Sequence, residues 1–351
     1  MSRVAVVLFN LGGPDRPEAI RPFLFNLFND PAILRLPTVP RWFLAQWISR
    51  RRAKVAAGIY AELGGKSPLL EGTEAQASAL EAALGELGTV KVFTAMRYWH
   101  PMSPAVAAEV AGWQPDRVVL LPLYPQFSTT TTASSLREWH RAAAVAGLDA
   151  PSRAICCYPT QAAFVEAQAR SIGPLLEKAT AAGAPVRLLF SAHGLPERVV
   201  AAGDPYQWQM ERCAAAVAAR LDGDWPGLDW RLAYQSRVGR LVWIGPSTED
   251  EIDAAGRDGR ALVVVPIAFV SEHSETLVEL DIEYRERAEQ TGVRGYYRVP
   301  ALGTDRGFIE GLAALVRAAL AGAADDIGSE SGERMCPATF SGCPMQPGAV
   351  E

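Results

Sequence analysis

The chain has 351 residues, 49% of them hydrophobic and 21% charged, and a net charge of −5 at pH 7. Its length and apolar content favour two α/β domains of ordinary size. The negative charge argues against general binding to nucleic acid, and no apolar run approaches the roughly 18 residues that span a membrane. We therefore expect a cytoplasmic protein, in which the five cysteines do not form structural disulfides.

Short apolar runs predict strands along most of the chain, and alanine-rich helical stretches separate most of them. The predicted strands are Val4–Phe9, Val90–Ala95, Arg117–Leu121, Val186–Phe190, Trp230–Tyr234 and Leu262–Ile267. The predicted helices include Glu74–Leu84, Pro104–Ala111, Gln161–Ala182, Gln207–Arg220 and Gly307–Leu320. Alternation of buried strands with helices predicts parallel, doubly wound sheets.

The same pattern divides the chain into segments. A first α/β domain is predicted over residues 1–150 and a second over residues 151–305, followed by a helix in residues 306–324 that packs back on the body. Residues 325–351 are rich in Gly, Ser, Pro and Cys and are predicted to form a tail.

Large apolar side chains are concentrated between residues 21 and 52, in numbers that one helix cannot bury. Pro22–Phe28 and Arg41–Ile48 carry most of them, and Arg50–Arg52 follow directly. An ordinary core helix with a basic end would explain the pattern. An alternative is an apolar lip with cations at its edge, which would suit a flat hydrophobic ligand bearing carboxylates or rest on a membrane surface.

Polar side chains follow two of the early strands. Arg97, Tyr98 and His100 come directly after the second strand, and a run rich in hydroxyls, residues 128–135, follows the third. Such hydroxyls commonly cap helices and satisfy loops. Because both stretches follow strands, they are nonetheless predicted to lie at the same rim.

Four glutamates with a helical spacing follow the apolar run of residues 262–270. They are Glu272, Glu275, Glu279 and Glu283. At about 100° per residue they fall on one stripe, while Leu277, Leu280 and Tyr284 can face a core. Carboxylates four residues apart repel by a few tenths of a kcal/mol, so the repetition suggests a cation here, although a solvated helix face is an alternative. The stripe begins where a strand gives way to a helix, which is where open α/β sheets usually bind ligands.

A histidine stands at the end of another predicted strand. The buried run of residues 188–190 leads to His193, and Gly194 then allows a tight turn. A histidine at a strand end is often structural, but the glutamate stripe occupies an equivalent strand end. Neutral imidazole facing carboxylate can hold an iron-like divalent metal with open positions, and histidine can accept a proton near neutral pH. The sequence therefore predicts a chemical site made by His193 and the glutamates.

These motifs closely resemble the ferrochelatase family over residues 4–320. The resemblance rests on Leu11-Gly-Gly-Pro14, Gly64-Gly-Lys-Ser-Pro68, Arg97-Tyr98, Tyr124-Pro-Gln-Phe-Ser128, Ser191-Ala-His-Gly-Leu-Pro196, Gly203-Asp-Pro-Tyr206 and the stretch Phe269–Tyr284. It implies two Rossmann-like domains of the chelatase type, with doubly wound parallel sheets and an active cleft between them. It also implies a lyase that inserts Fe(II) into protoporphyrin IX, releasing two protons and forming protohaem in the last step of haem biosynthesis.

The resemblance also implies roles for individual residues. His193 and Glu275 match the pair that faces the porphyrin centre, and both are expected to be catalytic and metal-binding. The expected metal path is Glu272, Glu279 and Glu283, and the expected porphyrin-binding residues are Leu11, Arg51, Arg52, Ser67, Arg97, Tyr98 and Trp243. Arg51 and Arg52 are expected partners for propionates, at the entrance that the lip provides. On this expectation an apolar cleft holds the porphyrin bent, His193 accepts pyrrole protons, and Glu275 helps Fe(II) to bind or to shed water.

A 2Fe–2S cluster is a further expectation, because some members of the family hold one on an internal cysteine and a C-terminal group of cysteines. The candidate ligands are Cys156, Cys157, Cys336 and Cys343, with Cys213 in reserve. Met345 stands where some relatives have a further cysteine, so four thiolates require both Cys156 and Cys157, or Cys213. The alternative is a disordered tail with incidental thiols.

Two other functions compete with this interpretation. One is a sister chelatase that uses coproporphyrin or another tetrapyrrole, which turnover on the two porphyrins would separate. The other is a porphyrin or metal carrier without catalysis, which would need a pocket but no proton acceptor such as His193. The expected partners are protoporphyrin IX and ferrous iron, with no nucleic acid. The lip is also a candidate for peripheral contact with the inner membrane.

Overall fold

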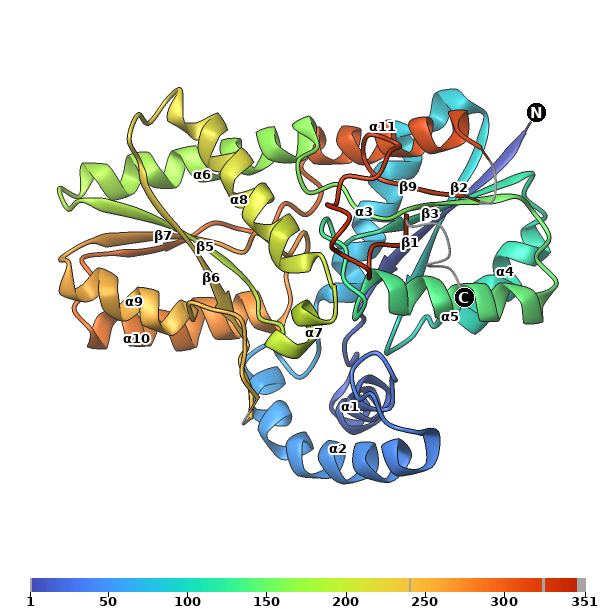
Figure 1. The fold of residues 1–351 in the computed structure, drawn as a ribbon, viewed down its shortest axis with the longest axis horizontal. Coiled ribbons are helices and arrows are strands. Elements are labelled where there is room, and N and C mark those ends of the chain that lie inside the picture. The colour runs from blue at the N-terminus through green and yellow to red at the C-terminus, as the bar shows by residue number, and fades with distance from the viewer. Residues whose placement is uncertain (1, 240, 324–325, 346–351) are drawn as a thin grey trace. The chain divides into compact units, whose positions relative to one another are not determined.

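The computed structural model describes residues 2–239, 241–323 and 326–345. Its backbone separates into two compact units. Unit 1 contains residues 1–157, 312–335 and 344–351, and unit 2 contains residues 158–311 and 336–343. Each unit has its own parallel sheet with helices packed on it (Figure 1). The predicted α/β class with two parallel sheets is therefore confirmed.

Unit 1 is built on a five-stranded sheet in which all neighbours run parallel. The strands are β1 (Arg3–Asn10), β2 (Thr89–Met96), β3 (Arg117–Pro122), β4 (Ser152–Ile155) and β9 (Asp326–Gly328), in the order β2-β1-β3-β4-β9. Of these, β1, β2 and β3 confirm the first three predicted strands. The strands β4 and β9 were not predicted, because runs of four and three residues are too short to show a period.

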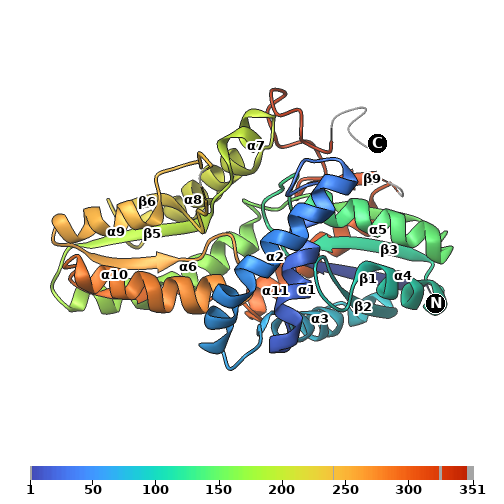
Figure 2. The same ribbon diagram turned by 90° about the horizontal axis from the view of Figure 1, so that it is seen from below.

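Helices cover both faces of this sheet (Figure 2). They are α3 (Leu69–Ala83), α4 (Ser103–Trp113), α5 (Thr132–Ala146) and the part of α11 (Arg306–Ala321) that belongs to unit 1, with short 3-10 turns at Pro17–Ala19 and Gly85–Leu87. Val106, Val110 and Trp139 of α4 and α5 pack against apolar side chains of β1 to β3. Because both faces are covered, β1 is buried from Val4 to Asn10.

Two further helices of unit 1 precede α3. They are α1 (Ile20–Phe28) and α2 (Thr38–Ala61). The first buries Ile20 and Phe23 in an apolar cluster. The second leaves Trp42, Phe43 and Trp47 exposed, with 63% of Phe43 accessible to solvent. Of the alternatives that the sequence left open for this segment, core packing describes one side of α1, while α2 carries large apolar side chains that are exposed.

Unit 2 is built on a four-stranded parallel sheet. The strands are β5 (Val186–His193), β6 (Asp229–Gln235), β7 (Ala261–Val265) and β8 (Tyr296–Arg298), in the order β6-β5-β7-β8. The helices are α6 (Ala162–Ala181), α7 (Glu197–Ala201), α8 (Tyr206–Asp222), α9 (Thr248–Arg257), a π-helix (Glu275–Glu283) and α10 (Tyr284–Gln290). In Figure 1, α6 and α8 lie on one face of the sheet, and α9 and α10 lie on the other. The strand predicted to reach Ile267 ends at Val265, because Pro266 has no N–H for the ladder.

The C-terminal segment contributes to both units. Residues 326–328 form β9, and residues 336–343 belong to unit 2. Residue 324 of the predicted helical segment, and residues 325 and 346–351 of the predicted tail, lie outside the described residues. Within the described part of the chain, no helix has the length and apolar character needed to cross a membrane.

Candidate active site

The sheet of unit 2 has a topological switch point beside β5. Of the four strands, β5 comes first in the chain but lies between β6 and β7 in the sheet. The chain therefore adds β6 on one side of β5 and β7 on the other. Open α/β sheets bind ligands beyond the carboxyl ends of their strands at such a point. The residues that end β5 and β6 and those that follow β7 are therefore placed where a ligand would be expected.

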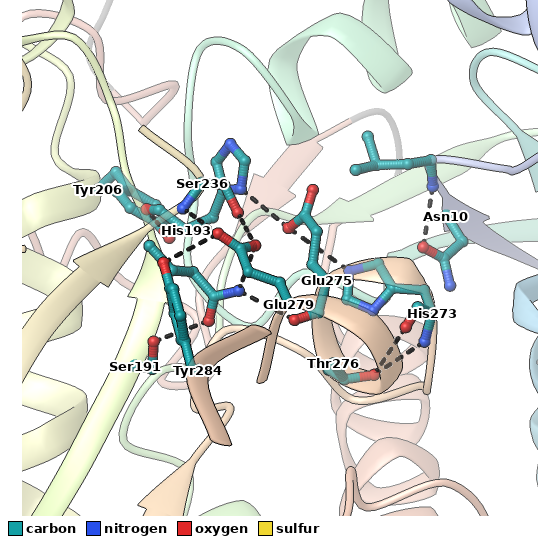
Figure 3. Close-up of polar contacts among 12 residues, drawn as sticks. Asn10, Ser191, His193, Tyr206, Ser236, His273, Glu275, Thr276, Glu279 and Tyr284 are labelled. Atoms are coloured by element: carbon teal, nitrogen blue, oxygen red, sulfur yellow. Dashed lines mark hydrogen bonds and ion pairs between the residues drawn. The ribbon is translucent and has the colours of Figure 1, made fainter. Parts of the chain in front are cut away.

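His193 and Glu275 face each other at this edge (Figure 3). His193 is the last residue of β5, and Glu275 is the first residue of the π-helix that follows β7. Their Nδ1 and Oε2 atoms are 2.9 Å apart, and 38% and 30% of the two side chains are exposed. Because a carboxylate only accepts hydrogen bonds, Nδ1 donates, and Nε2 of the neutral ring keeps its lone pair. The structure brings these two predicted residues together.

Each member of this pair favours the charged form of the other. Burial disfavours an imidazolium, but the negative charge of Glu275 and the hydrogen bond that it accepts outweigh burial and raise the pKa of His193 above its ordinary value. Burial alone would raise the pKa of Glu275, but the charge and hydrogen bond of His193, with help from His273, hold it far below its ordinary range. The site therefore holds an anionic carboxylate beside an unusually basic imidazole.

A second histidine approaches the same carboxylate. His273 Nε2 lies 3.6 Å from Glu275 Oε2, and the backbone N–H of His273 donates to Thr276 Oγ1. The His273 ring also packs on Phe269, with ring centroids 4.4 Å apart. Among the described residues, Glu275 Oε1 has no hydrogen-bond partner. One oxygen of the Glu275 carboxylate is thus available to a ligand.

The helix after β7 differs from the one predicted. Glu275–Glu283 is a π-helix, whose i→i+5 hydrogen bonds widen each turn, and not an α-helix at about 100° per residue. The α-helical winding predicted for this stretch is therefore wrong. Leu280 and Tyr284 do face the core, as predicted, whereas Leu277 is only partly buried. Short π-helices occur frequently at functional sites.

Glu279 is held by four hydrogen-bond donors. Ser236 donates its backbone N–H over 2.8 Å and its hydroxyl over 2.6 Å, Gln235 Nε2 donates over 2.9 Å, and the Tyr284 hydroxyl donates over 3.0 Å. Ser236 adopts a φ of 59°, in the left-handed region, and both of its donors meet this carboxylate. Burial and the charge of Glu275 raise the pKa of Glu279, and the hydrogen bonds from Ser236 and Gln235 only partly offset this.

The other two glutamates lie in different surroundings. Glu272 Oε1 accepts hydrogen bonds from Arg298 Nη1 at 2.7 Å and from the backbone N–H of Ala301 at 2.9 Å. Burial would raise the pKa of Glu272, but the hydrogen bonds and charge of Arg298 bring it below its ordinary value. Glu283 is exposed at the end of the π-helix. Glu272 is thus fixed in an ion pair, whereas Glu283 faces solvent.

Trp243 lies next to the turn that follows His193. It pairs with Pro196 in an isolated antiparallel bridge, and its indole N–H donates to the Val238 carbonyl over 3.2 Å. A Cβ atom on Gly194 would stand 2.9 Å from the Gln235 carbonyl oxygen and 3.3 Å from the Trp243 ring. Only glycine therefore fits between the end of β6 and this indole, directly after His193.

In unit 1, four of the residues expected to bind porphyrin gather at the ends of β1 and β2. The backbone N–H of Tyr98 donates to the Leu11 carbonyl over 2.9 Å. Ser67 is packed on the glycine turn after β1, because a Cβ on Gly13 would come within 2.5 Å of its Cβ and Oγ. Arg97 and Tyr98 follow β2 directly. The ends of these two strands thus collect Leu11, Ser67, Arg97 and Tyr98.

A buried carboxylate, Asp30, holds two of these side chains. Its Oδ2 accepts hydrogen bonds from Arg97 Nη2 at 2.8 Å and from the Tyr98 hydroxyl at 2.9 Å, and also from the hydroxyl of Ser134. Tyr98 is only 1% exposed, so its hydroxyl is committed to this contact. Arg51 and Arg52, by contrast, are exposed on α2, where they stack on the Trp47 and Phe28 rings at 4.9 and 5.9 Å.

All five cysteines are buried, and no disulfide joins them. Cys156 and Cys157 belong to unit 1, where their Sγ atoms are 3.2 Å apart, and Met345 packs against them. Cys336 and Cys343 belong to unit 2, and Gln209 Nε2 donates to Cys336 Sγ over 3.2 Å. Among the described residues, no three His, Cys, Asp or Glu side chains are grouped closely enough to hold a metal ion.

Comparison with known proteins agrees with the motifs of the sequence. The ferrochelatase family model matches residues 3–320. A ferrochelatase of Caulobacter vibrioides is 55% identical over 352 residues, which covers 99% of each chain. One of Phenylobacterium zucineum is 53% identical over 354 residues, again with 99% of each chain covered. The chain belongs to the ferrochelatase family. It is accordingly a lyase that inserts iron into protoporphyrin in haem biosynthesis.

A solved structure is similar at the level of the fold. SirB from Bacillus subtilis, determined with Fe3+, superposes with a TM-score of 0.52 at 11% identity, covering 91% of this chain and 96% of that chain. Its complex with cobalt, described as a sirohydrochlorin chelatase, gives a TM-score of 0.51 at 10% identity, with 91% and 95% covered. The chelatase-like fold expected from the sequence is thereby confirmed.

Several residues of the site escaped the sequence analysis. Gln235 ends β6 just as His193 ends β5, and Ser236 follows it, so a polar pair at the end of an apolar strand was a usable signal. His273 lies two residues before Glu275 inside the glutamate stretch, and its contact with that carboxylate is a feature of the loop that the residue spacing does not reveal. Asp30 gave no signal, because its partner Arg97 is 67 residues away.

Proposed function

We propose that His193 and Glu275 are the catalytic and metal-binding residues with which this chain inserts Fe(II) into protoporphyrin IX and releases two protons. The observation that carries the proposal is the 2.9 Å contact between His193 Nδ1 and Glu275 Oε2 at the switch point of unit 2. This contact pairs a proton acceptor with an anionic ligand. Membership of the ferrochelatase family supports the same reaction.

His193 accounts for the proton chemistry. A free porphyrin carries two pyrrole N–H groups, and both protons must leave as the divalent metal binds. With Nδ1 bonded to Glu275, the lone pair on Nε2 accepts a pyrrole proton, and the neighbouring carboxylate stabilises the imidazolium that forms. Because the imidazole is 38% exposed, it can pass this proton to water before it accepts the second.

Glu275 accounts for the metal chemistry. Its pKa lies below the ordinary range, so the carboxylate stays anionic and offers Oε1 to Fe(II). Carboxylate oxygen and imidazole nitrogen are both ordinary ligands of iron. We place Glu283 and Glu279 on the route by which Fe(II) reaches Glu275, since Glu283 is exposed and Glu279 is partly buried. Glu272, held by Arg298, adds a fixed negative charge near the start of the π-helix.

We propose that the porphyrin is bound by the residues of each unit that the family resemblance implies. In unit 1 the support is that Leu11, Ser67, Arg97 and Tyr98 gather at the ends of two strands, although the Tyr98 hydroxyl is held by Asp30. The exposed guanidinium groups of Arg51 and Arg52 suit propionates. In unit 2 the support is the position of Trp243 beside the turn after His193.

The test is an anaerobic reaction of the purified protein with protoporphyrin IX and Fe(II), followed by the porphyrin absorption spectrum. Loss of a general base typically costs about 10²- to 10⁴-fold in kcat, so we expect a loss of that size in His193→Ala. His140→Ala, which removes an exposed histidine of α5, is the matched control and should leave kcat unchanged. Full activity in His193→Ala would show that this assignment is wrong, and a wild type that binds porphyrin without inserting iron would indicate a carrier.

We also propose a 2Fe–2S cluster on Cys156, Cys157, Cys336 and Cys343. The support is the chemistry of the donors, because thiolates are the usual ligands and the hydrogen bond from Gln209 to Cys336 Sγ is typical of cluster sulfur. No step of iron insertion passes through the cluster. Anaerobically purified protein should contain iron and inorganic sulfide with a brown colour that Cys343→Ser removes. Colourless protein without sulfide would exclude the cluster.

Peripheral contact of this cytoplasmic chain with the inner membrane is a further proposal. Its support is the exposed face of α2, which carries Trp42, Phe43 and Trp47 next to Arg50–Arg52. Aromatic side chains beside cations are typical of surfaces that lie at a lipid headgroup layer. Wild-type protein should sediment with anionic vesicles, and Trp42→Ser with Phe43→Ser should not. Equal sedimentation of both proteins would contradict membrane contact through this face.

A further inference from the structure

Gln235 links the two strands and the helix that carry the catalytic pair. It is the last residue of β6, is fully buried, and stands opposite His193 in the parallel register of β5 and β6. The backbone N–H of Gly194 donates to the Gln235 carbonyl over 2.9 Å, which extends the ladder one residue past His193. The main chain of Gln235 therefore fixes the backbone position of His193.

The side chain of Gln235 has a single orientation. Its Oε1 accepts a hydrogen bond from the Ser191 hydroxyl at 2.7 Å. Its Nε2 faces only acceptors, namely the Glu275 carbonyl oxygen at 3.0 Å and Glu279 Oε2 at 2.9 Å. A flipped amide would place its oxygen against these two oxygens, so the hydrogen-bond network excludes the flip. Both N–H groups of the amide are thus committed to the π-helix.

These two contacts hold opposite ends of one turn of the π-helix. The first meets the backbone of Glu275, and the second meets the side chain of Glu279, four residues later. Glu275 also contacts His193 through its own side chain, so its backbone and its carboxylate are each tied to the end of a strand. Removing the amide would leave a buried carbonyl and a carboxylate with one donor fewer each.

We propose that Gln235 is a positioning residue, which holds the start of the π-helix so that the Glu275 carboxylate stays against His193. The inference rests on the proposed function, because it concerns the geometry of the His193–Glu275 pair. Gln235 itself touches neither iron nor porphyrin, since it is fully buried. Its loss should slow the reaction at the metal centre and leave the binding of porphyrin unchanged.

The test is Gln235→Met, which keeps the volume of the side chain and removes the amide. Displacement of a reacting group by about 1 Å typically costs on the order of 100-fold, so we expect kcat to fall by about 10- to 100-fold, with KM for protoporphyrin within about twofold of wild type. Gln161→Met is the matched control, because Gln161 Nε2 also donates to a main-chain carbonyl, that of Gly311, and Gln161 caps α6. It should lower the melting temperature without lowering kcat.

The inference would be overturned if Gln235→Met kept the wild-type kcat, or if its kcat fell no further than that of Gln161→Met. It would also be overturned if a higher KM for porphyrin accounted for the whole loss of activity in Gln235→Met. Ser191→Ala serves if Gln235→Met does not fold, because it removes only the hydroxyl that orients the amide. Its kcat should fall by about two- to fivefold, as expected for one neutral hydrogen bond, and an unchanged kcat would also overturn the inference. If the wild type inserts no iron, the proposed function fails instead.

Discussion

Replacing Glu275 by glutamine removes the negative charge beside His193 and keeps the size of the side chain. In the wild type, this charge stabilises the imidazolium that forms when His193 accepts a pyrrole proton. Glutamine can still accept a hydrogen bond from Nδ1, so the ring orientation should survive. The substitution therefore separates the electrostatic contribution of Glu275 from its effect on the position of His193.

The size of the effect follows from the geometry. Two unit charges 2.9 Å apart attract by about 6 kcal/mol at an effective dielectric constant of 20. Because roughly a third of each side chain is exposed, we reduce this value by about half, to about 3 kcal/mol. Since 1.36 kcal/mol corresponds to a factor of ten in rate, we expect Glu275→Gln to lower kcat by about 100-fold.

The assay is anaerobic iron insertion measured across pH. His193 must be neutral to accept a proton, and its pKa is raised, so the wild type should lose kcat/KM for porphyrin on acidification at a higher pH than an ordinary histidine would dictate. Without the charge of Glu275, the acidic limb should move to lower pH, while the plateau above it falls. A variant with a wild-type plateau, or with an unmoved acidic limb, would refute the electrostatic role of Glu275.

Two further predictions concern residues outside the catalytic pair. Asp30→Asn should lower the free energy of unfolding by about 3–5 kcal/mol in chemical denaturation, because it leaves the charge of Arg97 without its buried partner, and an unchanged midpoint would contradict this. Glu283→Gln should raise KM for Fe(II) by about threefold without loss of stability, because this exposed carboxylate acts only by attracting the cation. A KM that stays at the wild-type value in steady-state kinetics would remove Glu283 from the metal path.

Features that depend on single strands were predictable from the sequence. His193 ends one apolar run and Glu275 follows another, so their common sheet edge could be inferred without knowing which strands are neighbours. All six described strands longer than four residues were also predicted, because each coincides with a recognisable apolar run.

Features that depend on tertiary contacts were not predictable. The glutamate spacing is compatible with an α-helix, and only the contacts of Gln235 with the backbone of Glu275 and the side chain of Glu279 reveal how the wider turn is held. The ion pair of Asp30 with Arg97 joins a loop to a strand end far along the chain. Neither residue belongs to a periodic pattern, so local sequence carries no trace of the contact.

Unit 1 takes its last strand from the far end of the chain, and this has a consequence for biosynthesis. The four strands of unit 2 all lie between residues 186 and 298, so its sheet can assemble on the ribosome before β9 has been translated. The sheet of unit 1 must wait for residues 326–328, with β4 as an open edge in the meantime. Nascent chains that stall before Asp326 would expose this edge to neighbouring polypeptides, and shortening the C-terminus would make the exposure permanent.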